Sequence, residues 1–315
     1  MAYRRLVTAV ASAALLSVSL SLSAGVPKDL PYPSGTPSAD EIAQQVYFVN
    51  HFYAVKNYGI TKKGRTITVL INKAKGDNTP STITLERFLN NEYEAGEAIN
   101  AMDLAIFRSG KLRGTGMLIT DFTDDSKSQS YAIWLPALRK IRRFAEPAHD
   151  DAWGGTDFTF GDVTLRKPSD ETHELLGTET FNDCLGAIEG VQVKYLPEPP
   201  APSCAHKGKS VYKLKSTTKR QNWWYDERIS YIDAKTFADF RSEYFKNGEK
   251  VKVIDRDWGS LGLADSRAQS WRYWYGKTFA TGHETWAVIP EEVVEFNQDW
   301  KKSLWSEKTL RKIKR

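Results

Sequence analysis

Five histidines are the first residues to consider for catalysis or metal binding, because imidazole can transfer protons and bind metal ions near neutral pH. They are His51, His149, His173, His206 and His283. None belongs to an HExxH pair, no GxSxG elbow is present, and Gly208-Lys209-Ser210 lacks the glycine that begins a phosphate-binding loop. With no catalytic motif in the sequence, we expect a protein that is not an enzyme and needs no cofactor.

The densest cluster of candidate metal ligands is His149-Asp150-Asp151, with Asp157 and Asp162 further along the chain. Imidazole and carboxylate groups could together bind a metal ion. The alternative is an exposed acidic loop flanked by glycines. We expect the loop, and no metal site.

A run of positive charge forms the other chemical feature, Arg139-Lys140-Ile141-Arg142-Arg143. In a strand, side chains alternate between the two faces, so Arg139 and Arg143 would share one face and Arg142 would lie on the other. Both faces would carry charge, and at least one should meet water or an anion. Ordinary surface charge and structural ion pairs are the alternative roles for Arg139, Arg142 and Arg143.

The N-terminus predicts export. Arg4 and Arg5 precede an apolar stretch from Leu6 to Leu22, and small residues follow, as in a cleavable signal peptide over residues 1–24. A membrane anchor is the alternative, but it needs about 20 strongly apolar residues, and serines interrupt this shorter run. Removal of the two arginines lowers the formal net charge from +5 to +3 (+5 − 2), which does not indicate nucleic-acid binding.

Two cysteines, Cys184 and Cys204, lie in the exported part. In an oxidising compartment they could pair, closing a loop of about 20 residues and stabilising the fold by roughly 3 kcal/mol. Two free thiols are the alternative, and the sequence favours the disulfide. Neither cysteine lies near the predicted cleavage site, so we expect no lipid anchor there.

The segments expected to position these residues begin with a proline-rich linker over residues 25–37. A capping box, Ser38 to Glu41, then predicts a helix that runs to about Asn57. Its apolar stripe is formed by Ile42, Val46, Val49 and Tyr53. A second amphipathic helix is predicted over residues 291–306, from Val293, Phe296 and Trp300, followed by a solvated basic tail over residues 307–315.

Between these helices the apolar period changes to two, which is typical of strands. The predicted strands cover residues 64–71, 82–89, 100–108, 114–122, 130–135, 173–181, 188–196, 210–217, 224–233, 238–246, 250–256, 269–276 and 283–289. Asn247-Gly248 between two alternating runs is typical of a hairpin turn. Many short strands joined by turns predict a mainly β, antiparallel sheet or barrel in one domain, residues 38–306.

Three segments resemble the LolA-like family of outer-membrane lipoprotein-sorting proteins. They are Arg113-Gly114-Thr115-Gly116, the run from Trp134 to Phe144 (WLPALRKIRRF), and Gly154 to Val163 (GGTDFTFGDV). The same motifs also resemble a neighbouring family of periplasmic proteins of unknown function. The close match covers about 50 residues. The segment between Cys184 and Cys204 matches no feature of the family.

The resemblance implies an unclosed antiparallel β-barrel whose apolar concave face, covered by helices, holds the acyl chains of a lipid or lipoprotein. We therefore expect a periplasmic carrier that moves cargo toward the outer membrane and contacts membranes only transiently. An inner-membrane transporter is the implied partner, and no nucleic acid is. The residues expected to line the cavity are Met117, Ile119, Tyr131, Ile133, Leu135 and Phe158.

Two further groups of residues acquire expected roles from this resemblance. Arg139, Arg142 and Arg143 would contact lipid headgroups or a partner at the mouth of the cavity. Ile42, Val46, Val49 and Tyr53 would face the cavity from a lid helix. The alternative function is a structural or interaction module of the cell envelope whose core is filled by its own side chains, in which case the apolar residues are ordinary core.

Overall fold

The computed structural model describes residues 25–77, 79–94, 96–124, 126–145, 150–163, 166–191, 195–196 and 201–313. The predicted signal peptide, residues 1–24, and His149 lie outside these ranges. No helix within them is long and apolar enough to cross a membrane. Residues 25–37 pack onto the domain: the Lys28 ammonium donates to the Asn91 carbonyl (2.8 Å) and Arg267 donates to the Leu30 carbonyl (2.8 Å).

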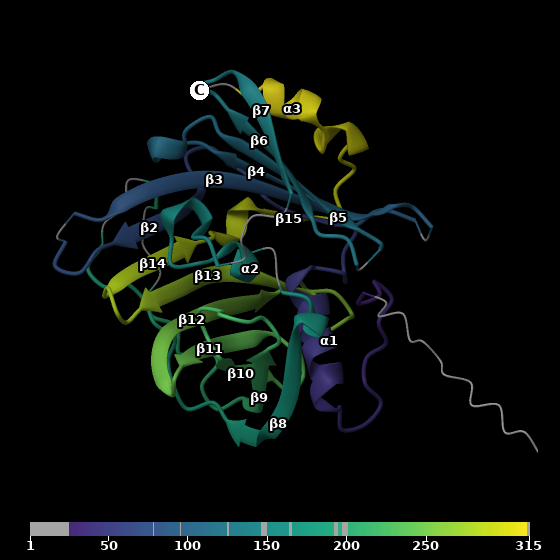
Figure 1. Cartoon of the computed structure of the whole chain (residues 1–315), viewed down its shortest axis with the longest axis vertical. Helices are drawn as coiled ribbons and strands as arrows, with labels where there is room; N and C mark the ends of the chain where they lie inside the picture. Colours follow the sequence, from purple (N-terminus) through teal and green to yellow (C-terminus); the bar gives the residue numbers. More distant parts are fainter. Residues whose placement is uncertain are drawn as a thin grey trace, which may run out of the picture.

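One antiparallel sheet dominates the fold (Figure 1). Its strands lie in the order β7-β6-β5-β4-β3-β2-β14-β13-β12-β11-β10-β9-β8, and β1 pairs with both β3 and β15. The first and last strands of this order, β7 and β8, are not paired with each other, so the sheet remains open. The mainly β, unclosed architecture predicted from the sequence is confirmed.

The strands in the first half of the chain are β1 (Asn57–Ile60), β2 (Thr68–Lys73), β3 (Ser81–Asn90), β4 (Ile99–Phe107), β5 (Gly116–Phe122), β6 (Ser130–Leu135) and β7 (Lys140–Ala145). Those in the second half are β8 (Glu171–Thr180), β9 (Ser210–Thr218), β10 (Glu227–Asp233), β11 (Asp239–Lys246), β12 (Glu249–Ser260), β13 (Gln269–Thr278), β14 (His283–Val288) and β15 (Val294–Phe296). The helices are α1 (Ala39–Asn50), α2 (Phe160–Val163) and α3 (Glu307–Arg311), with 3-10 turns η1 (Gly110–Leu112), η2 (Trp153–Gly155), η3 (Pro168–Asp170), η4 (Glu291–Val293) and η5 (Lys302–Leu304).

The sheet is curved, and α1 and α2 lie on the side that we call the inner face (Figure 1). Residues 153–163, which we call the plug segment, run along this face and bury Trp153, Phe158 and Val163. The other side, the outer face, carries α3, which contacts β5, β6 and β7. It also carries the described residues of 181–206 (181–191, 195–196 and 201–206), which we call the outer segment. Gly186 of this segment approaches the ring of Tyr275.

The first helix begins as predicted and ends earlier. Ser38 and Glu41 form the capping box, but α1 stops at Asn50, not near Asn57, so the prediction of its length was wrong. Phe52 has a φ of 55°, and its ring stacks on Tyr58 at 3.8 Å between centroids. Packing of Phe52 into the core holds this left-handed conformation, which interrupts the helix. Tyr53 therefore lies beyond the helix.

The predicted C-terminal helix over residues 291–306 is also wrong. Val294 and Phe296 pair with Ile60 and Tyr58 of β1, forming β15. Trp300 then lies across Gly59, where an added Cβ would stand 2.4 Å from the indole ring. The apolar residues that suggested a helix thus complete the sheet and cover its outer face.

Two more expectations need correction. The predicted strand over residues 188–196 is absent from its described residues, 188–191 and 195–196, which belong to the outer segment. The predicted solvated tail is folded in its described residues, 307–313, because α3 inserts Leu310 fully into a cluster with Leu104, Ile106, Leu118 and Trp305. The apolar side chain of Leu310, rather than the basic side chains around it, therefore determines where α3 lies.

Candidate functional site

The inner face of β5 and β6 brings together five of the six residues predicted to line a cavity. Met117 pairs with Ile133 and Ile119 with Tyr131, and Leu135 continues the same face of β6. Met117, Ile119 and Tyr131 are buried, whereas Ile133 and Leu135 are partly exposed. The sixth, Phe158, belongs to the plug segment and not to the sheet.

The plug segment fills the space in front of these strands with its own aromatic rings. Trp153 packs on Phe107 (5.4 Å between ring centroids) and Phe158 meets Trp274 edge-on (5.4 Å). Phe160 meets Tyr131 in the same way at 5.8 Å. The Trp153 N–H donates to the Phe158 carbonyl (2.7 Å), so the segment is folded tightly on itself.

The spaces left around the plug segment are small. One of about 40 Å³ lies among Leu70, Phe158, Val163 and Trp274, and another of about 40 Å³ lies beside Arg87, Ile119 and Asp121. Pockets that hold drug-sized ligands measure about 300–1,000 Å³. In this conformation, the described apolar half of the interior is therefore filled by the protein's own side chains.

The mouth of this half lies at the open edge of the sheet, on β6 and β7. Phe144 and Arg142 pair with Tyr131 and Ile133, so they share the inner face with Leu135. Phe144 is 48% exposed, and Lys140 and Arg142 are exposed beside it. An apolar strip with cationic neighbours thus runs from the buried interior to solvent.

The three arginines predicted to contact headgroups do not converge. Arg139 lies in the turn between β6 and β7 with a φ of 49°. Arg143 faces outward and holds both carboxylate oxygens of Glu307 on α3, at 2.6 and 2.8 Å. Arg142 alone is on the inner side of the strand. The alternation expected for a strand holds, and it separates the charges.

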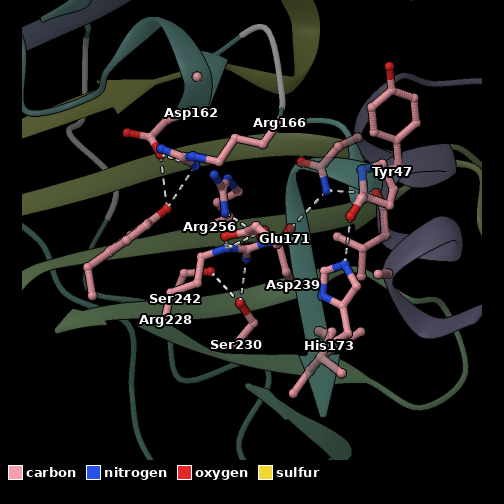
Figure 2. A pocket seen from close by; sticks show the side chains of 18 residues that line it. Tyr47, Asp162, Arg166, Glu171, His173, Arg228, Ser230, Asp239, Ser242 and Arg256 are labelled. Carbon is pink, nitrogen blue, oxygen red and sulfur yellow. Dashed lines mark hydrogen bonds and ion pairs between the residues drawn. The ribbon is translucent and has the colours of Figure 1, made fainter. Parts of the chain in front are cut away.

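The other half of the interior, between α1 and β8–β12, is polar (Figure 2). A cavity of about 50 Å³ is lined by three arginines, and each has a carboxylate partner. Arg228 holds Glu171 (2.7 Å), Arg166 holds Asp162 (2.8 Å), and Arg256 pairs with Asp239. The three pairs are at least four-fifths buried, and their net charge is zero.

Burial and charge act in opposite directions on these carboxyl groups. Burial would raise the pKa of Glu171, but the Arg228 guanidinium outweighs it and lowers the pKa to about 2. Burial likewise would raise the pKa of Asp162, yet attraction to Arg166 and Lys252 holds that pKa well below its ordinary value. Both groups therefore remain ionised acceptors, and neither is placed to act as a general acid.

Tyrosines complete the polar half. The Tyr225 hydroxyl donates to Glu171 (2.8 Å) and the Tyr244 hydroxyl to Asp162 (2.9 Å). The Asn50 amide, at the end of α1, donates to Asp239 (3.0 Å). This network joins α1, the end of the plug segment and the four strands β8, β10, β11 and β12, so it holds these elements together.

The described histidines are also held in structural contacts. His173 donates from Nε2 to the Pro168 carbonyl (3.0 Å) and accepts at Nδ1 from Ser216 (2.9 Å). His283 contacts Asp157 (2.6 Å), which also accepts from Thr285 (2.7 Å). Within the described ranges, no three His, Cys, Asp or Glu side chains are grouped to hold a metal ion.

Cys184 and Cys204 are disulfide-bonded. The outer segment they cross-link is pinned to β12: Asp255 accepts from the Gly186 N–H (2.7 Å), and Asp257 contacts the buried His206 (2.7 Å). The polar half and this pinning were missed by sequence reasoning. Apart from Asp162 and Arg166, which are four positions apart, the paired Arg, Asp and Glu residues lie on separate strands and form no local motif that could have revealed them.

Known proteins of similar sequence or structure show to which class this fold belongs. A family model described only as an uncharacterised protein matches residues 100–194, and no curated protein matches the chain. Three solved structures resemble it over 87% of its length. One is a candidate outer-membrane lipoprotein-sorting protein domain from Vibrio parahaemolyticus, with 16% identity, a TM-score of 0.64 and 98% of that chain covered. The others are a DUF1329 family protein from Desulfovibrio piger (12% identity, TM-score 0.62, 100% of that chain) and a LolA superfamily protein from Nitrosomonas europaea (10% identity, TM-score 0.53, 100% of that chain). The chain thus has the LolA-like fold that the sequence motifs predicted.

Proposed function

We propose that this protein is a periplasmic carrier that binds the acyl chain of a lipid or lipoprotein on the inner face of β5–β7. The observation that carries the proposal is the continuous apolar strip that runs from buried Met117 and Ile119 to exposed Phe144 at the open sheet edge. The LolA-like fold supports it, since similar structures include a candidate lipoprotein-sorting domain and a LolA superfamily protein.

Acyl binding in this proposal requires the plug segment to move. A 14-carbon chain gains roughly 10 kcal/mol on burial, at about 0.8 kcal/mol per CH₂, before ordering costs. The acyl chain would replace Phe160 against β6 and Trp153 against the neighbouring β4, so the cargo would keep much of that apolar surface away from water. The polar half stays in place and holds the far end of the plug segment through Asp162.

Charge at the mouth gives a preference among lipids. Arg142 and Lys140 are exposed beside the apolar strip, and they would attract an anionic headgroup as the acyl chain enters. Arg143 is already paired with Glu307, so its replacement should change headgroup preference less. A transporter in the inner membrane is the kind of partner that would load such a carrier.

Native mass spectrometry with myristoyl lysophosphatidylglycerol tests the proposal. We expect the mature protein to take up one lipid. Leu135→Glu should weaken uptake by roughly tenfold or more, because lipid binding would bury the new carboxylate against the acyl chain. Leu263→Glu, at an exposed leucine in the β12–β13 connection, is the matched control and should bind like the native chain. Apo mass alone at every lipid concentration would refute the carrier.

The small interior spaces favour a second candidate, a structural or interaction module of the envelope with a self-filled core. The two candidates differ in one property. A module takes up no lipid, and substitutions at Leu135 and Leu263 then change only its stability or its protein contacts.

A further inference from the structure

A cationic cleft of about 1280 Å³ crosses the outer face of the sheet at β3. It is lined by Lys62, Arg65, Arg108, Arg113 and Glu86, with hydroxyl groups from Thr84 and Ser109. Glu86 pairs in register with Ile106, which packs in the cluster beneath α3, so the cleft opens on the opposite side from the inner face. It is therefore separate from the apolar strip of β5–β7.

The topology of β3 builds this cleft. β1 and β2 pair with successive parts of β3, and the seven residues between them leave the sheet as a loop closed by a bridge between Lys63 and Thr66. Beyond β4, η1 folds back so that Gly110, with a φ of +68°, lies close to Ile83. Two loops thus stand on either side of a short stretch of β3.

The cleft concentrates positive charge, and most of it has no ion-pair partner among the described residues. Arg108 is paired with Glu86. Lys62, Arg65 and Arg113 are exposed, and no described residue forms an ion pair with any of them. Four cations and one carboxylate leave +3 (4 − 1) in this cleft, against +5 for the whole chain. Unpaired like charges around a concave surface are stabilised when an anionic ligand binds.

We propose that this cleft binds an extended acidic segment of a partner protein. Three of its four cations are arginines, whose guanidinium groups hold carboxylates in two-pronged pairs. Its volume exceeds the usual 300–1,000 Å³ of small-molecule pockets. The large exposed apolar side chains of the described chain are Tyr32, Leu138, Phe144, Leu176, Leu263 and Phe279; none lines the cleft, so it is not built to insert into a bilayer.

Fluorescence anisotropy with a labelled octaglutamate peptide tests this site in the full mature chain. We expect saturable binding that weakens as NaCl rises, because salt screens charge pairs. The double variant Arg65→Glu/Arg113→Glu should bind roughly tenfold or more weakly. The matched control is Lys207→Glu/Lys235→Glu, which changes net charge equally at two exposed lysines elsewhere and should bind like the same chain without substitutions.

Other outcomes overturn the proposal. Equal loss in both double variants would mean that net charge, not the cleft, attracts the peptide. Binding of inorganic pyrophosphate without peptide binding would assign the cleft to a small phosphate ligand. Cleft-dependent binding to phosphatidylglycerol vesicles without peptide binding would assign it to a membrane surface. Lipid uptake by the Arg65→Glu/Arg113→Glu variant is expected to be unchanged, so this test is independent of the carrier function.

Discussion

Arg228 on β10 grips Glu171, the first residue of β8, through two nitrogens: Nη2 lies 2.7 Å from Oε2 and Nε lies 3.0 Å from Oε1. The pair spans the intervening strand β9, where Ser216 is fully buried. It links the edge strand β8 to β10, two strands further into the sheet. Substitutions at this pair therefore test how much the polar half contributes to the stability of the fold.

Breaking that pair on one side should be costly. Glu171→Gln leaves the buried Arg228 guanidinium without a counter-charge, and we expect the free energy of unfolding to fall by about 3–5 kcal/mol. Urea unfolding followed by tryptophan fluorescence measures this. The exposed pair of Glu179 and Lys213 on the neighbouring strands β8 and β9 is the control, and Glu179→Gln should cost about 0.5 kcal/mol or less. Equal losses for both variants would contradict a structural role of the buried pair.

Stability should also fall below neutral pH, through His51. Burial lowers the pKa of His51 to about 3, so the folded protein keeps this imidazole neutral while the unfolded chain protonates near pH 6.5. Because the folded pKa is the lower one, this contribution to stability is complete above pH 6.5 and is lost progressively toward pH 3. Each pH unit in that window costs about 1.4 kcal/mol.

The variant His51→Gln isolates this effect. Between pH 6 and 5, where carboxyl groups contribute little, its free energy of unfolding should change less steeply with pH than that of the native chain, by about 1 kcal/mol per unit. Urea titrations at several pH values give the slope. His173, whose pKa burial also lowers, contributes to the slope that remains. Identical slopes in the two proteins would show that His51 is not the group responsible.

The disulfide should stabilise the outer segment more than the sheet. Closing the 20-residue span between Cys184 and Cys204 is expected to contribute roughly 3 kcal/mol on the chain-entropy model. The variant Cys184→Ser/Cys204→Ser should therefore lower the unfolding free energy by about that amount. Limited proteolysis should cut it first in the outer segment while the β10–β13 strands persist. An outer segment that is cut no faster than in the native chain would argue against this placement of the stabilisation.

Local signals in the sequence were sufficient for the parts of the fold that depend on neighbouring residues. The capping box of Ser38 and Glu41 starts α1 as predicted, and Asn247 and Gly248 take the positive φ values (51° and 80°) of a hairpin turn. The alternation on β5 and β6 correctly placed Met117, Ile119, Tyr131, Ile133 and Leu135 on one face. The sequence did not reveal what this face contacts, because the plug segment that covers it comes from later in the chain.

Long-range contacts decided what the sequence could not reveal. Glu171 and Arg228 are 57 positions apart, so the residues next to each of them in the sequence could not predict their pairing. The spacing of Val293, Phe296 and Trp300 fits a helix, yet pairing with β1 and a close approach to Gly59 turn the segment into a strand and a cover. Similarly, Phe52 ends α1 only because Tyr58 and Trp271 receive its ring.

Hydrogen exchange of the plug segment on addition of myristoyl lysophosphatidylglycerol tests the carrier account most directly. Binding of one lipid should speed exchange of the amides of Trp153, Phe158 and Phe160, which are hydrogen-bonded in the closed form, while β12 and β13 stay protected. Unchanged exchange at these amides, with or without bound lipid, would contradict displacement of the plug segment by an acyl chain.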